Sequence, residues 1–157
     1  MRVIGIDPGL GVTGFGILDR NNNRIEVKHF GTIRPPAGRP LAERLHYLFD
    51  NIMKLIAEYQ PQVLAVEDTF HGKNIRTALL LGQARGVLLL AGARSGITCC
   101  EYAPRKVKQS VTGNGAATKE QVQYMVKAML KLDKLPTPID ASDALAVGLC
   151  HLHQEKG

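Results

Sequence analysis

The sequence predicts an α/β fold in which a mixed five-stranded sheet carries helices on both faces. Two observations predict it. Three strand-like segments joined as a meander are followed by alternating helical and strand-like segments. The continuously apolar segment 63–66 is typical of a central strand buried on both faces. With 157 residues, of which 45% are hydrophobic and 22% charged, we expect a single domain spanning residues 1–157.

The first strands are expected at residues 2–6, 12–19 and 24–33. The run Asn21-Asn22-Asn23 between the second and third is a turn signal. Within the third, apolar and charged residues alternate, as in a strand with one buried face. Segment 97–102 resembles a fifth strand.

Five helices are expected, and local signals mark their ends. Leucine and isoleucine recur at helical spacing in residues 40–59, and Pro61 stops that helix. Thr118 and Gln121 fit a capping box that opens a helix running to about 132. The other helices are expected at about 74–94, from 104 to a Gly-Asn-Gly break at 113–115, and at 139–153.

The charge distribution indicates a polyanionic partner. The net charge is +6 and the isoelectric point is about 9.4. Residues 73–134 contain eleven Lys or Arg and three Asp or Glu, a charge of +8, whereas the remainder carries −2. A basic stretch beside an acid-bearing remainder suits an enzyme that binds phosphates and a divalent metal. A solvated basic helix face is the alternative interpretation.

Features that would direct the chain out of the cytoplasm are not evident. We expect no membrane span, because no apolar stretch reaches about 18 residues. Asp7 comes too early for a signal peptide. The three cysteines have no metal-like spacing, and their odd count favours a reduced protein. These observations predict a cytoplasmic protein without a membrane partner.

Four acids are candidates for one site. Asp7 and Glu67 follow apolar strands, and ligands gather at the carboxyl ends of strands in open α/β sheets. Asp140 and Asp143, three residues apart in the last expected helix, share one helix face. Each acid alone also fits a turn residue, a helix cap or a first-turn acid. Their joint placement favours a metal site.

The chemistry of such a cluster indicates the ion. Clustered carboxylates raise each other's pKa and become stable when a divalent cation neutralises them. Ligands that are all oxygen select Mg²⁺, Mn²⁺ or Ca²⁺ over zinc. Two ions about 3.5–4 Å apart form the clamp used for phosphodiester hydrolysis. We therefore expect Mg²⁺, with Mn²⁺ as a substitute, and two ions per site.

Several ordered segments together resemble the RuvC family of bacterial Holliday junction endonucleases. They are Gly5-Ile6-Asp7-Pro8-Gly9, Gly14-Phe15-Gly16, Val66-Glu67 leading to Phe70, Leu81-Gly82-Gln83-Ala84-Arg85-Gly86, Val107-Lys108-Gln109, Gly113-Asn114-Gly115 and Asp140-Ala141-Ser142-Asp143-Ala144-Leu145-Ala146. One Asp-x-Gly motif is weak, but the ordered set is very specific and spans nearly the whole chain.

The resemblance implies a ribonuclease H-like fold and a crossover junction endodeoxyribonuclease. Such an enzyme is a homodimer that resolves four-way DNA junctions by paired symmetric nicks in recombination and repair. It works with the RuvA and RuvB branch-migration proteins. The family's four catalytic, metal-binding acids match Asp7, Glu67, Asp140 and Asp143.

The resemblance also implies DNA contacts. Lys108 and Lys119 match the family's basic residues near the site, and Phe70 matches an aromatic residue that stacks on unpaired bases. Lys73 and Arg76 are close enough to Phe70 in sequence to contact phosphate. Without the resemblance, each lysine also fits a solvated helix residue, and Phe70 also fits a loop aromatic packed on the core.

A few residues need separate interpretation. Asp68 stands where the family leads us to expect an uncharged polar residue, and alternation along the strand should point it away from Glu67. His151 and His153 are expected in a solvated tail. Helix 74–94 is apolar on all sides, so we expect a second chain to cover part of it.

Three other classes of protein remain possible from the sequence. An actin-like ATPase also uses Asp-x-Gly after a strand, but that fold needs two such domains. A related ribonuclease H-like nuclease would act on RNA or another nucleic-acid structure. A non-catalytic junction-binding protein would bind equally well and cut nothing, although its four acids would then have no reason to occur together.

Overall fold

The computed structural model describes residues 1–68 and 74–155. The strands pair side by side in the order β3-β2-β1-β4-β5. Strand β2 is antiparallel to both β1 and β3, whereas β4 is parallel to both β1 and β5. The expected mixed five-stranded sheet is thus confirmed. Its strands are β1 (Arg2–Asp7), β2 (Thr13–Asn21), β3 (Arg24–Ile33), β4 (Val63–Glu67) and β5 (Thr98–Tyr102).

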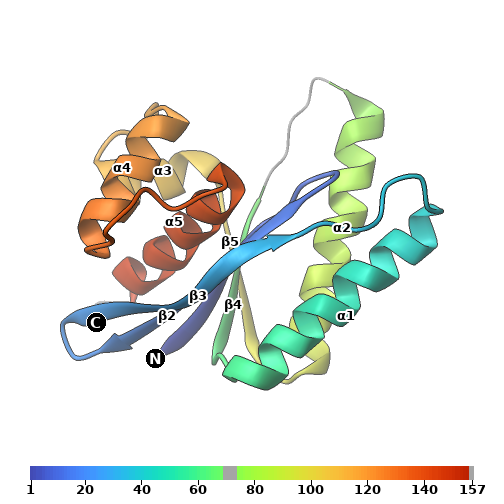
Figure 1. Cartoon of the computed structure of the whole chain (residues 1–157), viewed down its shortest axis with the longest axis horizontal. Coiled ribbons are helices and arrows are strands. Elements are labelled where there is room, and N and C mark those ends of the chain that lie inside the picture. The colour runs from blue at the N-terminus through green and yellow to red at the C-terminus, as the bar shows by residue number, and fades with distance from the viewer. Residues whose placement is uncertain (69–73, 156–157) are drawn as a thin grey trace.

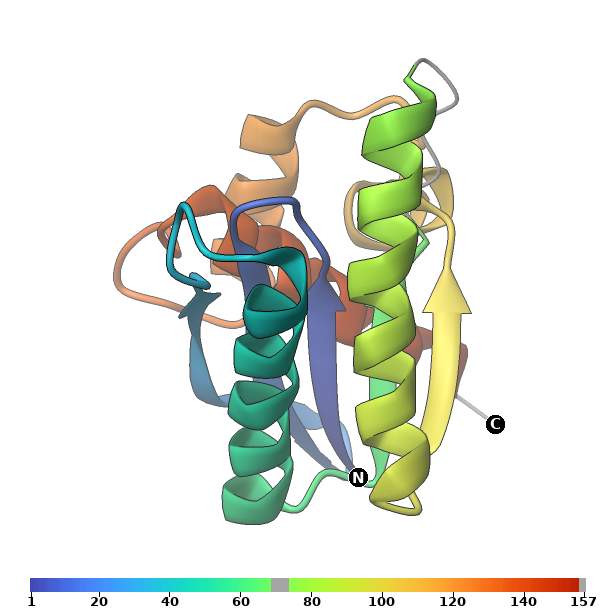
Figure 2. The same cartoon turned by 90° about the vertical axis from the view of Figure 1, so that its right-hand side faces the viewer.

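Helices cover both faces of the sheet, as expected. Figure 1 shows α1 and α2 on one face and α3, α4 and α5 on the other. Figure 2 shows α1 and α2 side by side across their face. The helices are α1 (Leu41–Tyr59), α2 (Ile75–Arg94), α3 (Pro104–Thr112), α4 (Lys119–Met129) and α5 (Ile139–Gln154).

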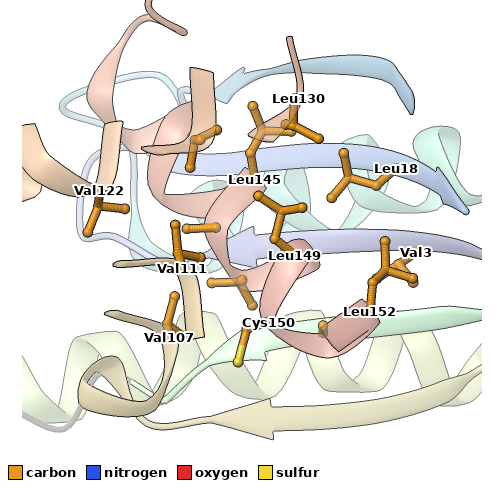
Figure 3. Packing of buried hydrophobic residues seen from close by; sticks show 14 of the residues in the cluster. Val3, Leu18, Val107, Val111, Val122, Leu130, Leu145, Leu149, Cys150 and Leu152 are labelled. Carbon is orange, nitrogen blue, oxygen red and sulfur yellow. The ribbon is translucent and has the colours of Figure 1, made fainter. Parts of the chain in front are cut away.

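Two hydrophobic cores follow from this layering. One lies between the sheet and α1 with α2, where residues such as Ile6, Val66 and Leu88 are buried. The other lies between the sheet and α3, α4 and α5. Figure 3 shows this second core, with Leu145 and Leu149 of α5 packed among side chains from both sides. Strand β4 contributes to both cores, as its continuously apolar sequence predicted.

Helix α5 lies very close to the sheet because glycines face it. A Cβ atom on Gly5 of β1 would lie 2.3 Å from the carbonyl oxygen of Ala144, far inside van der Waals contact. On α5 itself, a Cβ on Gly148 would lie 2.8 Å from a methyl carbon of Leu18 in β2. The helix is therefore buried along most of its length, from Ala141 to Leu152.

Helix α2 presents two different faces. By length and composition alone it qualifies as a membrane-crossing helix, contrary to our expectation that no segment would. Its buried residues nevertheless pack on the sheet, as in the core helix of a folded domain. Its opposite face carries Ile75, Leu79 and Leu90, which are 81%, 63% and 58% exposed. The part of the helix that we expected a second chain to cover is therefore exposed in a single chain.

The structure corrects two details of the sequence analysis. Helix α4 ends at Met129 rather than near 132, because Lys131 adopts a left-handed conformation with φ 52°. His151 is only 2% exposed, so the expected solvated tail is wrong. Its Nδ1 lies 2.7 Å from the Tyr102 hydroxyl of β5. His153 is hydrogen-bonded through Nδ1 to Ser110.

Candidate functional site

Asp7 and Glu67 lie beside each other at the same edge of the sheet. Strands β1 and β4 are parallel, with Ile6 opposite Val66, so the next residue of each strand is an acid. The pKa of Asp7 is raised to about 9, chiefly by burial and then by the negative charge of Glu67 and a hydrogen bond with it. Two carboxylates in this arrangement cannot both be charged without a neutralising partner.

The first turn of α5 brings two more acids to this edge. Asp140 lies in that turn, and Asp143 follows three residues later on the same helix face. Gly14, which is paired with Asp7 across β1 and β2, makes this approach possible. A Cβ on Gly14 would lie 2.0 Å from the carbonyl oxygen of Asp140. The missing side chain thus sets the distance between α5 and the acidic end of β1.

A lysine from a third element faces the acids. The predicted capping box at Thr118 and Gln121 is present, and it places Lys119 in the first turn of α4. Lys119 Nζ lies 3.4 Å from Asp143 Oδ2. Burial raises the pKa of Asp143 to about 6, against the lowering effect of Lys119. Asp143 in turn is the main reason that the pKa of Lys119 is raised. The capping box in the sequence signalled this position, but not the ion pair.

All four acids line one pocket of about 240 Å³. Lys108 of α3 and Lys119 of α4 line it too, so two cations face four carboxylates. The apolar wall could not be identified from the sequence, because it comes from α2, α3, α4 and α5 together. The lining residues are Asp7, Pro8, Glu67, Leu81, Pro104, Val107, Lys108, Lys119, Val122, Asp140, Asp143 and Ala146.

The donor set fits divalent ions of the magnesium type. Its side chains offer carboxylate oxygen and neither sulfur nor imidazole, the ligand type that Mg²⁺ and Mn²⁺ prefer. Within residues 1–68 and 74–155, no three His, Cys, Asp or Glu side chains are arranged to bind one metal ion in this metal-free structure. Burial and the neighbouring carboxylates of Glu67 and Asp143 raise the pKa of Asp7, so its ionised form is disfavoured in this pocket. A divalent ion would relieve that repulsion.

The other expected DNA contacts are placed less completely. Phe70 and Lys73 lie outside the described residues. Arg76 is exposed in the first turn of α2 and does not line the pocket. Asp68 points away from Glu67, as strand alternation predicted, and pairs with a side chain of α2.

Comparison with known proteins agrees with the fold and with the ordered motifs. The family model described as crossover junction endodeoxyribonuclease RuvC matches residues 3–151. A relative of that name from Pelotomaculum thermopropionicum is 49% identical over 153 residues, covering 98% of this chain and 93% of the relative. One from Desulforamulus reducens is 48% identical over 151 residues, covering 96% and 93%.

Solved structures give the same result. The structure of Thermus thermophilus RuvC superposes with a TM-score of 0.88 at 31% identity, covering 98% of this chain and 94% of that one. T. thermophilus RuvC in complex with a Holliday junction substrate has the same TM-score and coverage at 28% identity. The five-stranded sheet, its two helical layers and the matched sequence together show that this chain belongs to the RuvC family of crossover junction endodeoxyribonucleases.

Proposed function

We propose that this protein is a metal-dependent endonuclease that resolves four-way DNA junctions by paired symmetric nicks during recombination and repair. The observation that carries the proposal is the pocket where four carboxylates from β1, β4 and α5 face Lys108 and Lys119. The complex of the T. thermophilus relative with a Holliday junction supports the choice of substrate.

The four acids would hold the metal. Asp7, Glu67, Asp140 and Asp143 supply enough carboxylate oxygens for two Mg²⁺ ions, for which Mn²⁺ would substitute. Divalent ions in such a site activate the attacking water and stabilise the leaving oxygen of a phosphodiester.

The protein's own groups prepare the site for this chemistry. Lys119 favours the ionised form of Asp143, which keeps that oxygen available as a ligand near neutral pH. Lys108 and Lys119 lie where they would bind the scissile phosphate and offset negative charge that develops on it.

We also propose DNA contacts outside the pocket. Arg76 is exposed at the start of α2, directly after the segment that contains Phe70 and Lys73. We propose that Arg76 and Lys73 bind phosphate and that Phe70 stacks on an unpaired base, a contact worth about 1–3 kcal/mol that tolerates any sequence.

The exposed face of α2 would join two copies of the chain. Ile75, Leu79, Gly82, Gly86 and Leu90 follow one another at intervals of three or four residues, so they lie along one side of the helix. The two glycines have open space in front of them, which allows a second helix to approach closely. A homodimer with two-fold symmetry would present two active sites to a junction with matching symmetry.

The cellular setting follows from the substrate and the family. We propose that the protein acts in the cytoplasm, where bacterial DNA lies. RuvA and RuvB would move the branch point of the junction that this protein cuts.

Cleavage of a mobile four-way junction tests the function directly. The protein is incubated with the junction, a linear duplex or an RNA–DNA hybrid, in Mg²⁺ or EDTA. Paired nicks in the junction alone, abolished by EDTA, are the expected result. Cutting of the hybrid instead would assign another nuclease activity, and tight junction binding without cutting would make the protein a non-catalytic binder.

A further inference from the structure

Arg85 of α2 joins the ends of two neighbouring strands. Its Nε donates a 2.6 Å hydrogen bond to Glu101 Oε1 in β5, and a second guanidinium nitrogen contacts the same oxygen. Its third nitrogen lies 3.5 Å from Asp68 Oδ1, directly after β4. All three nitrogens of the guanidinium are thus directed at two carboxylates from different strands.

These two carboxylates flank Glu67. Glu101 is paired with Val66, the residue before Glu67, and Asp68 is the residue after it. The Asp68 N–H also donates a 2.7 Å hydrogen bond to the Tyr102 carbonyl, which extends the β4–β5 pairing one residue beyond the strand. Arg85 therefore holds the backbone on both sides of Glu67.

The alternation of side chains separates this cluster from the metal-site pocket. Glu67 lines the pocket on the α5 side of the sheet, whereas Asp68 and Glu101 reach Arg85 on the α2 side. The negative charge of Asp143 repels that of Glu67, which favours displacement of Glu67 from the cluster. A fixed backbone at the end of β4 opposes that displacement.

Arg85 is poorly suited to bind phosphate. Two carboxylates already neutralise it, and its side chain is only 31% exposed. Ion pairs that are partly exposed add little to the stability of a fold. Their effect here is local, because they fix the residues that carry one metal-site carboxylate.

We propose that Arg85 is a positioning residue that, through Asp68 and Glu101, holds Glu67 in place for metal binding. This inference rests on the proposed metal-dependent function. Asp68 takes part in this role because its carboxylate lies 3.5 Å from the Arg85 guanidinium.

The test compares metal binding with DNA binding in matched variants. Arg85→Gln removes the charge, Arg85→Lys retains it, and Glu101→Gln weakens the same contact without altering Arg85. Arg24→Gln is the control, because Arg24 forms a 3.0 Å pair with Glu26 at the opposite end of the sheet. Mn²⁺ binding is measured by calorimetry without DNA, junction affinity in EDTA, cleavage over a Mg²⁺ titration, and folding by thermal unfolding.

Groups that support metal ligands typically change metal affinity about 10- to 100-fold when they are lost. We expect Arg85→Gln and Glu101→Gln to weaken Mn²⁺ binding about tenfold and to raise the Mg²⁺ concentration for half-maximal cleavage equally. Junction affinity in EDTA should change less than twofold. Arg85→Lys should restore part of the metal affinity, and Arg24→Gln should behave as the wild type.

Two results would overturn the inference. A loss of junction affinity at unchanged Mn²⁺ affinity would make Arg85 a phosphate contact. Unchanged Mn²⁺ affinity and cleavage in both Arg85→Gln and Glu101→Gln would reduce the cluster to a surface ion pair. If Arg85→Gln fails to fold, Glu101→Gln decides alone. A wild type that neither binds Mn²⁺ nor cuts the junction would instead refute the proposed function.

Discussion

Replacing Asp7 with asparagine should stabilise the metal-free protein while removing its response to Mg²⁺. The pKa of Asp7 rises from 3.8 to about 9 on folding, chiefly through burial and then through Glu67. Between these values the folded chain binds a proton that the unfolded chain releases. The stability of the wild type therefore falls as the pH rises, whereas asparagine remains neutral throughout.

The size of the stabilisation depends on how far the working pH lies above 3.8, the pKa of Asp7 in the unfolded chain. Each pH unit in this range is worth about 1.4 kcal/mol. The free energy of unfolding of the variant should thus exceed that of the wild type by about 2 kcal/mol at pH 5 and by up to about 4 kcal/mol at pH 7 in EDTA. Mg²⁺ at ten times its Kd should raise the free energy of unfolding of the wild type by about 1.4 kcal/mol and leave that of the variant unchanged.

Urea unfolding followed by circular dichroism measures both effects at pH 5, 6, 7 and 8. Asp133→Asn is the matched control, because Asp133 is an exposed acid in the loop after α4. It should change the free energy of unfolding by less than about 0.5 kcal/mol at every pH. An Asp7→Asn gain that does not grow with pH, or a loss of stability at pH 7 in EDTA, would refute the argument that unneutralised carboxylates crowd this site.

Three further predictions concern the approach of α5, the lysine in the pocket and the dimer. Gly14→Ala should destabilise the fold by about 1–3 kcal/mol in urea unfolding and weaken Mn²⁺ binding, because the new Cβ meets a backbone oxygen of α5 at 2.0 Å; Gly11→Ala, in open space, should do neither. Lys119→Ala should shift the acidic limb of the cleavage–pH profile to higher pH, because loss of the lysine raises the pKa of Asp143, which is already about 6. An unshifted limb would mean that Asp143 is not required in its ionised form. Leu79→Glu should give a monomer in light scattering at micromolar concentration, whereas Tyr124→Glu, on a residue of equal exposure in α4, should leave the dimer intact; a dimer that survives Leu79→Glu would place the interface elsewhere.

Local patterns in the sequence were sufficient to predict most elements of the fold. Alternation predicted the exact span of β3, and leucine spacing with Pro61 predicted α1 to within one residue. These signals arise from residues that are close together in the chain, so they can be recognised without the tertiary structure. The end of α4 was misplaced because no local signal marks the left-handed conformation of Lys131.

The sequence by itself determined that four acids occur where strands end and where a helix begins, and the ordered motifs identified their family. Only the tertiary structure decided how these acids meet. Gly5 and Gly14 allow α5 to touch the sheet, Lys119 reaches Asp143 from α4, and Arg85 pairs with Asp68 and Glu101 beside Glu67. Such contacts join segments far apart in the chain, and their geometry depends on close packing rather than on any local periodicity.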